Sequence, residues 1–159
     1  MPIYYTPATI FMTQAKDIVA ANTVYYGCDG FDGLESEFDV TTVSQSITML
    51  SHFNSKATTG AAGDFINKYK EKYGAETLNQ FGASAYDCVY AIYGAMKKAM
   101  DAGKEIPVNI SASELCEILK DQFANGYTLT DAVTGDSITW QANGYVEKSA
   151  IRYVIKEAD

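Results

Sequence analysis

Two carboxylates, Asp29 and Asp32, lie among three glycines in the stretch TVYYGCDGFDG, which covers residues 23–33. The residues before the first glycine are β-branched or aromatic, and such residues favour a strand. In α/β proteins, ligands bind beyond the carboxyl ends of parallel strands, where the strands open into loops. The sequence therefore predicts a binding site at this loop, with Asp29 as its charged anchor.

The same residues also suit a purely structural role. Asp and Gly dominate turns, so Asp29 could serve the turn alone. Asp is a preferred N-cap residue, and Asp32 is interpreted as the cap of a short helix from Leu34 onward. The glycines are three residues apart and do not form the GxGxxG dinucleotide fingerprint. Phe31 and Val40 occupy the third and twelfth positions of a calcium loop, where Asp or Asn and Glu are needed.

No catalytic, metal or cofactor site is predicted. The sequence has no P-loop and no GxSxG elbow. His52 has neither a nucleophile nor an orienting acid at a suitable spacing, so it is not predicted to be a catalytic base. The three cysteines form no CxxC pair, and one histidine cannot complete a zinc set. Cys88 and Cys116 are expected to be buried free thiols on apolar helix faces.

Composition narrows the classes of partner. The 159 residues suffice for one domain or two small lobes, and 47% of them are hydrophobic, so a sizeable core is expected. A net charge of −8 argues against a nucleic-acid partner. No apolar run approaches the roughly 18 residues of a spanning helix. The N-terminus lacks a signal peptide and resembles the end of a strand, so the chain is expected to begin inside a longer protein.

Local patterns predict how the loop is positioned. A strand at residues 3–5, a helix at 7–20 and a strand at 23–27 would form a β-α-β unit with parallel strands. Their carboxyl ends would then share one edge, which brings Tyr4 and Tyr5 near Asp29.

The rest of the chain alternates helices with short strands. Further helices are predicted at 64–73, 84–102 and 111–124, and strands at 46–53, 137–141, 145–147 and 150–155. Asn143-Gly144 is a strong hairpin signal. Apolar periodicity predicts inward faces in the first and the longest helix. These residues are Ile10, Phe11, Ala15, Ile18 and Val19, and then Cys88, Val89, Ile92, Tyr93, Met96 and Met100.

The ordered segments GCDGFDG, SITMLSHF, FINKYKEKYG, FGASAYDCVYAIYGAMKKA and VTGDSITWQANGYVEKSAIRYVIK resemble the type I periplasmic binding proteins. The resemblance covers nearly the whole chain and is to the branch that binds branched-chain and other amino acids for ABC importers. It implies an α/β fold of two lobes with flavodoxin-like parallel sheets, joined by three crossing strands, with the ligand in the cleft.

On that plan the chain is the C-terminal half of such a protein, with a C-terminal β-hairpin. Residues 1–52 and 150–159 would belong to the second lobe, and residues 53–149 to the first. The resemblance implies that Asp29 binds the ligand ammonium group and that Tyr4, with Tyr5 beside it, packs on the ligand. It also implies that Phe31 lines the pocket. The crossing residues His52, Phe53 and Asn54 would form a hinge.

The resemblance implies a non-enzymatic, extracytoplasmic solute-binding component, either periplasmic or a cell-surface lipoprotein. Its ligand would be an amino acid. Its partners would be an ABC permease and either a missing N-terminal half or a second copy of the chain. A ligand-sensing domain of a receptor or regulator on the same fold is the alternative, and a flavodoxin-like enzyme domain is a third.

Overall fold

The computed structural model describes residues 1–75 and 77–158, which form two compact units. Unit 1 contains residues 1–54 and the segment from Ala150 onward, and unit 2 contains residues 55–149. The assignment of these units to the lobes of a binding protein stays a prediction. Residue 76 of the predicted first-lobe segment and residue 159 of the second-lobe segment lie outside the described residues.

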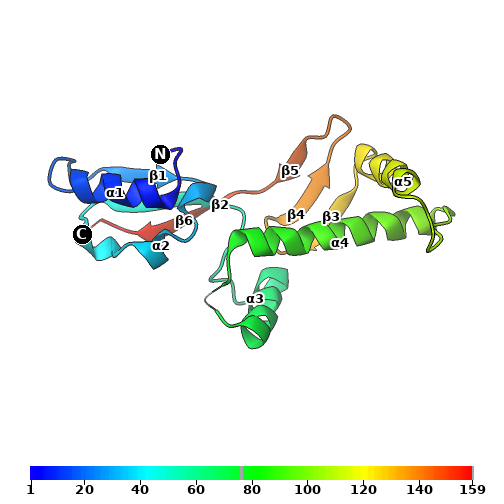
Figure 1. The fold of residues 1–159 in the computed structure, drawn as a ribbon, viewed down its shortest axis with the longest axis horizontal. Helices are drawn as coiled ribbons and strands as arrows, with labels where there is room; N and C mark the ends of the chain where they lie inside the picture. The colour runs from blue at the N-terminus through cyan, green and yellow to red at the C-terminus, as the bar shows by residue number, and fades with distance from the viewer. Residues whose placement is uncertain (76, 159) are drawn as a thin grey trace. The chain divides into compact units, whose positions relative to one another are not determined.

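Unit 1 is built on a three-stranded sheet (Figure 1). Its elements are α1 (Tyr5–Ala15), β1 (Val24–Gly27), the 3-10 turn η1 (Asp29–Phe31), α2 (Leu34–Glu37), η2 (Val40–Thr42), β2 (Ser46–Ser51) and β6 (Ile151–Lys156). The central strand β2 pairs in parallel with β1 and antiparallel with β6. Parallel neighbours need a crossover rather than a tight turn, and η1, α2 and η2 supply it.

One face of this sheet carries the core of unit 1. Its buried residues are Ala8, Met12, Tyr25, Phe31, Leu34, Val43, Ile47 and Met49. Tyr25 is paired with Ile47 in the register, and Met49 lies two residues further along β2, so all three point to the same face. Helix α1 covers that face through Ala8 and Met12 (Figure 1). The crossover contributes Phe31, whose ring occupies the space where a side chain at Gly27 would lie.

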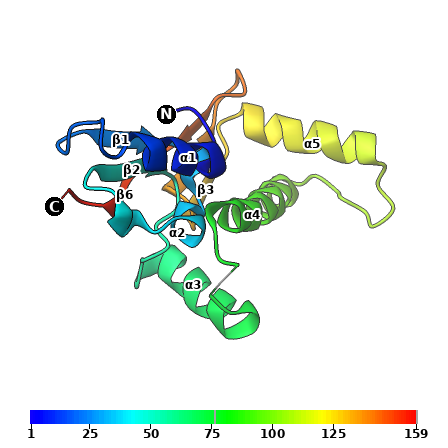
Figure 2. The same ribbon diagram turned by 60° about the vertical axis from the view of Figure 1, so that its left-hand side comes forward.

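Unit 2 combines three helices with an antiparallel sheet of order β3-β4-β5. Its elements are α3 (Gly60–Tyr73), α4 (Gln80–Asp101), α5 (Ala112–Ala124), β3 (Thr128–Ala132), β4 (Asp136–Trp140) and β5 (Val146–Lys148). Figure 2 shows α4 and α5, which pack together, from a second direction. Ala91 and Ala95 of α4 are buried against Tyr127, and Phe123 and Trp140 pack around it. Small residues on α4 therefore allow this close packing.

The predicted first strand is wrong. Residues 1–4 form no strand, and α1 begins at Tyr5 and ends at Ala15 rather than running from 7 to 20. Pro7 lies in the first turn of α1, where a missing backbone N–H leaves no intrahelical bond unmade. The helix can therefore begin before the proline. Strand β3 was not predicted, whereas the hairpin of β4 and β5 around Asn143-Gly144 is confirmed.

The predicted inward faces of α1 and α4 are also mostly wrong, although Ala15 of α1 is buried as predicted. Ile18 is 84% exposed, just beyond the end of α1, and Tyr93 of α4 is 62% exposed. The buried positions of the two helices are instead mostly alanines, with Met12, Gln80 and Asp87. Cys88 and Cys116 are exposed rather than buried. Periodicity identifies an apolar stripe, but a stripe of alanines can pack more closely against a neighbour and become the buried side.

Asp87 ties α4 to the turn between β3 and β4. Its carboxylate is 3% exposed and accepts hydrogen bonds from the backbone nitrogens of Val133 (2.9 Å) and Thr134 (2.8 Å). It also accepts a bond of 2.5 Å from the hydroxyl of Thr134, which is itself fully buried. A buried carboxylate with three donors is satisfied, and its removal would leave those donors unpaired.

We expect Asp87→Asn to lower the free energy of unfolding of unit 2 by about 1–3 kcal/mol, because the amide turns one acceptor into a donor that faces N–H groups. Urea unfolding followed by the fluorescence of Trp140, the single tryptophan, would measure this. Asp101→Asn is the control on the same helix, since its exposed pair with Lys97 contributes only about 0.3–0.5 kcal/mol. Equal losses in the two variants would contradict the role given to Asp87.

Candidate functional site

The Asp29 loop lies at the edge of the unit 1 sheet where two parallel strands end. Gly27, the last residue of β1, is paired with Met49, two residues before the end of β2. The turn that begins at Asp29 and the segment His52–Asn54 therefore follow neighbouring strands at the same edge. Such an edge is where α/β proteins place ligand sites.

The loop itself is a single 3-10 turn. The backbone N–H of Phe31 donates to the carbonyl of Cys28 (2.8 Å), and that of Asp32 donates to the carbonyl of Asp29 (3.1 Å). Asp29 is exposed, whereas the next residue but one, Phe31, is 1% exposed. The turn therefore leaves Asp29 at the surface, while Phe31 anchors the turn in the core.

Tyr4 lies beside this loop, although no strand places it there. A side chain carbon at Gly30 would lie 2.6 Å from the carbonyl oxygen of Ile3 and 3.1 Å from the Cα of Tyr4. Only glycine permits this approach. Tyr4 is 72% exposed, and its backbone is extended at the position before α1. Tyr5 is half-buried and packs against the core of unit 1.

The other predicted site residues have mixed placements. Phe31 is a core residue. A contact between its ring and a ligand stays a prediction, and the burial of the ring does not favour it. Asp32 does not occupy the N-cap of α2, because Gly33 does so with a φ of 90° and without a side-chain capping bond.

The three predicted hinge residues end unit 1. Phe53 is buried, and its backbone N–H donates to the Oγ of Ser51 (3.1 Å). The boundary between the units follows directly after Asn54. Hinge motion at His52, Phe53 and Asn54 stays a prediction.

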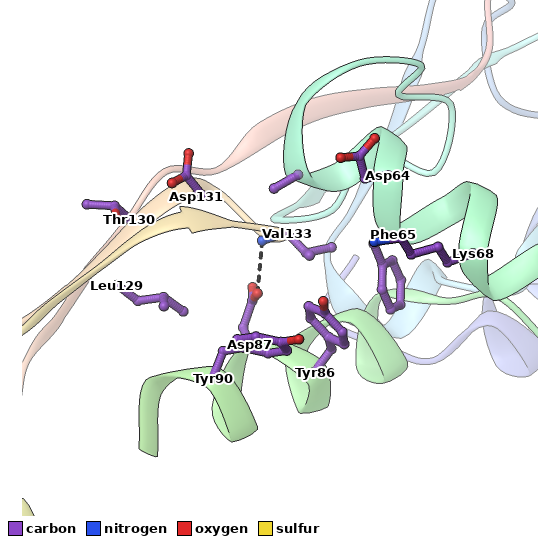
Figure 3. A pocket seen from close by; sticks show the side chains of 11 residues that line it. Asp64, Phe65, Lys68, Tyr86, Asp87, Tyr90, Leu129, Thr130, Asp131 and Val133 are labelled. Atoms are coloured by element: carbon purple, nitrogen blue, oxygen red, sulfur yellow. Dashed lines mark hydrogen bonds between the residues drawn. The ribbon is translucent and has the colours of Figure 1, made fainter. Parts of the chain in front are cut away.

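Unit 2 contains a cavity of about 270 Å³ that the sequence did not indicate (Figure 3). Its lining comes mainly from α3, α4 and β3. The lining residues are Ala61, Asp64, Phe65 and Lys68, then Tyr86, Asp87 and Tyr90 of α4, and then Leu129, Thr130, Asp131 and Val133. The ring centroids of Tyr86 and Tyr90 are 4.6 Å apart, and the ring centroid of Phe65 is 4.9 Å from that of Tyr86. Aromatic faces therefore form one wall, and the carboxylates of Asp64 and Asp131 lie on the other side.

The electrostatics of this cavity favour positive groups. Carboxylates and tyrosine faces both attract cations, and Lys68 is the lining cation. The hydrogen bond with Tyr90, burial, and the charges of Tyr90 and Asp87 raise the pKa of Tyr86 to about 12. Tyr86 therefore stays neutral at physiological pH. No sequence signal indicated this cavity, because Asp131 lies on the strand that was not predicted.

Two further searches of the described residues bear on the site. Within residues 1–75 and 77–158, no three His, Cys, Asp or Glu side chains come together in a way that could hold a metal ion. In the same residues no helix is both long and apolar enough to cross a membrane.

Gly30→Ala should push the Ile3–Tyr4 segment away from the Asp29 loop. Because overpacking of this kind costs about 1–3 kcal/mol, hydrogen exchange of the Ala8 amide, which donates to the carbonyl of Tyr4 (3.1 Å), should rise about tenfold or more. Gly82→Ala is the control, since its new carbon would meet only the Oδ1 of Asn79 at 3.7 Å. Unchanged exchange near Tyr4 in Gly30→Ala would show that the contact does not hold the segment in place.

Comparisons with known proteins support the fold. No protein-family model matches the chain, and no curated protein matches it. A solved structure does: the branched-chain amino acid transporter substrate-binding protein LivJ from Streptococcus pneumoniae, in complex with isoleucine. The likeness has a TM-score of 0.55 and 24% identity, and it covers 96% of this chain but 43% of the LivJ chain. The chain thus has a mixed α/β fold that matches part of a type I periplasmic binding protein fold.

Proposed function

We propose that this chain is part of an extracytoplasmic solute-binding component of an ABC importer and that it binds an amino acid through Asp29. The observation that carries the proposal is the position of Asp29. It is exposed in a turn at the carboxyl ends of β1 and β2, with Tyr4 beside it. The likeness to a solute-binding fold over 96% of the chain supports the same function.

The chemistry of the loop suits the amino group of a zwitterion. The ammonium group needs an acceptor, and a carboxylate gives a charge-assisted hydrogen bond of about twice the neutral strength. The exposed ring of Tyr4 offers an apolar surface for the ligand's side chain. Closure at His52, Phe53 and Asn54 would exclude water and strengthen the contact with Asp29.

The remainder of the site would come from elsewhere. The chain spans 43% of the length of the solved protein that it matches. Donors for the ligand's carboxylate are therefore proposed to lie on a partner polypeptide, which is either a missing N-terminal half or a second copy of the chain. An ABC permease would receive the ligand, and the protein would act in the periplasm or as a lipoprotein at the cell surface.

Calorimetric titration with isoleucine, leucine, valine, alanine, glutamate and lysine tests the proposal. We expect one of these amino acids to bind the wild-type chain when the partner polypeptide that completes the site is present, and Asp29→Asn to weaken its binding about 10- to 150-fold. That range corresponds to one hydrogen bond to a charged group. Asp32→Asn is the matched control in the same turn and should bind as the wild type does.

A ligand without the amino group tests whether Asp29 acts through a contact with that group. 3-Methylpentanoate, which is isoleucine without its ammonium, should bind the wild-type chain as weakly as isoleucine binds Asp29→Asn. The two losses should not add, because both remove the same interaction. Equal binding of isoleucine by the wild type and Asp29→Asn would return Asp29 to a turn role, and a panel with no ligand at all would refute the amino-acid assignment.

A further inference from the structure

The lining of the unit 2 cavity contains more acidic than basic side chains. The acidic ones are Asp64, Asp87 and Asp131, and Lys68 is the basic one. Asp87 is 3% exposed, and the three groups that donate hydrogen bonds to it are uncharged. They satisfy its carboxylate without cancelling its charge. Because a buried charge is screened less than an exposed one, Asp87 maintains a negative potential in the cavity.

Asp64 and Asp131 bring two further negative charges to the cavity. Asp64 lies on α3 and Asp131 on β3, and both are exposed. Within the part of the chain that the structure describes, neither carboxylate forms an ion pair or a hydrogen bond with another residue. Lys68 lines the same cavity but is not paired with either of them. Both carboxylates can therefore interact with a positive group that enters the cavity.

A β-bulge sets the direction of Asp131. The register between β3 and β4 shifts at this residue, and its φ is 56°, in the left-handed region. Bulges re-aim side chains, and they are common beside functional sites. In Figure 3, Asp64 and Asp131 lie across the cavity from the rings of Tyr86 and Tyr90. The charges and the aromatic wall thus occupy opposite sides of one cavity.

The aromatic wall is accessible to a ligand. Tyr86 and Tyr90 are 37% and 48% exposed, whereas Phe65 beneath them is 8% exposed. The face of an aromatic ring attracts a cation, and its carbon surface also accepts methyl and methylene groups. A ligand that uses both sides of the cavity must therefore be positive and partly apolar. The wall offers a metal ion no ligands, so an organic cation fits better.

We propose that the unit 2 cavity binds a small organic cation, namely an ammonium group with alkyl substituents. The alkyl groups pack on the rings of Tyr86 and Tyr90, and the positive nitrogen faces Asp64 and Asp131. A cavity of about 150 Å³ admits benzene, so the unit 2 cavity of about 270 Å³ has room for a ligand such as choline. This site goes beyond the amino-acid site proposed at Asp29, which lies in unit 1.

A titration with choline, followed by the amide NMR signals of the labelled wild-type chain, tests the proposal. Choline should shift the signals of residues that line the cavity. The matched ligand is 3,3-dimethylbutan-1-ol, which has the same shape with carbon in place of the charged nitrogen. It should bind about tenfold more weakly, because it loses the attraction of the rings and of the carboxylates.

Variants of the lining charges should change choline binding in opposite directions. Asp131→Asn should weaken it about two- to fivefold, and Asn tolerates the left-handed backbone as Asp does. Lys68→Gln removes the lining cation and should strengthen binding by a similar factor. Asp136→Asn is the matched control, since Asp136 is an exposed aspartate on the same hairpin with a φ of 60°, and it does not line the cavity.

Two variants of Tyr90 separate its ring from its hydroxyl. Tyr90→Phe keeps the aromatic face and should bind choline as the wild type does. Tyr90→Leu removes the face and should weaken binding about threefold or more. The fluorescence of Trp140, which packs in the core of unit 2, would confirm that each variant keeps its fold.

Three outcomes would overturn the proposal. Equal binding of choline and its neutral isostere would show that the cavity does not select a cation. Equal losses in Asp131→Asn and Asp136→Asn would reduce the effect to the net charge of the chain. The third outcome concerns a separately produced polypeptide that covers the rest of the solved fold. If its addition abolished the choline shifts, the cavity would be a packing surface for that part of the fold and not a ligand site.

Discussion

The parallel pairing of β1 with β2 is the constraint on which the rest of unit 1 depends. Parallel neighbours cannot be joined by a hairpin, so the chain must cross over the sheet between Gly27 and Ser46. That crossover supplies Phe31, Leu34 and Val43 to the core. The same pairing makes both strands end at one edge. The exposed position of Asp29 and the start of the connection to unit 2 therefore both follow from this parallel pairing.

Local sequence signals predicted the elements well where they were unambiguous. The run of β-branched and aromatic residues before Gly27, the strand at Ser46 and the Asn143-Gly144 hairpin are all confirmed. The segment before Pro7 was misread, because apolar residues such as Ile3 and Tyr5 suit a strand as well as the start of a helix. Most of the packed positions of α1 and α4, apart from Ala15, were misassigned because tertiary contact selected the alanine stripes. The apolar periodicity of a helix does not show which of its sides will pack against another element.

Some features of the candidate site could likewise be predicted from local sequence, and others could not. The position of Asp29 after a strand is a local property, and the sequence could predict it. The approach of Tyr4 to the loop is a long-range property that depends on the absence of a side chain at Gly30. The proximity of Tyr4 to Asp29 was predicted from a strand at residues 3–5, and the structure does not contain that strand. The cavity of unit 2 requires α3, α4 and β3 together, so no single stretch of sequence could reveal it.

The sequence order of the two units has a consequence for synthesis and folding. Unit 2 is inserted between β2 and β6, so unit 1 is interrupted in the chain. Ser51 meets Ile151 only after the whole of unit 2 has left the ribosome. Until then, the edge of β2 that β6 will cover has no partner strand and is open to other chains. A continuous unit 2 can fold first, and its folding shortens the effective loop that the last strand must close. Strand β6, which follows unit 2 in the sequence, thus adds the third strand to the sheet of β1 and β2.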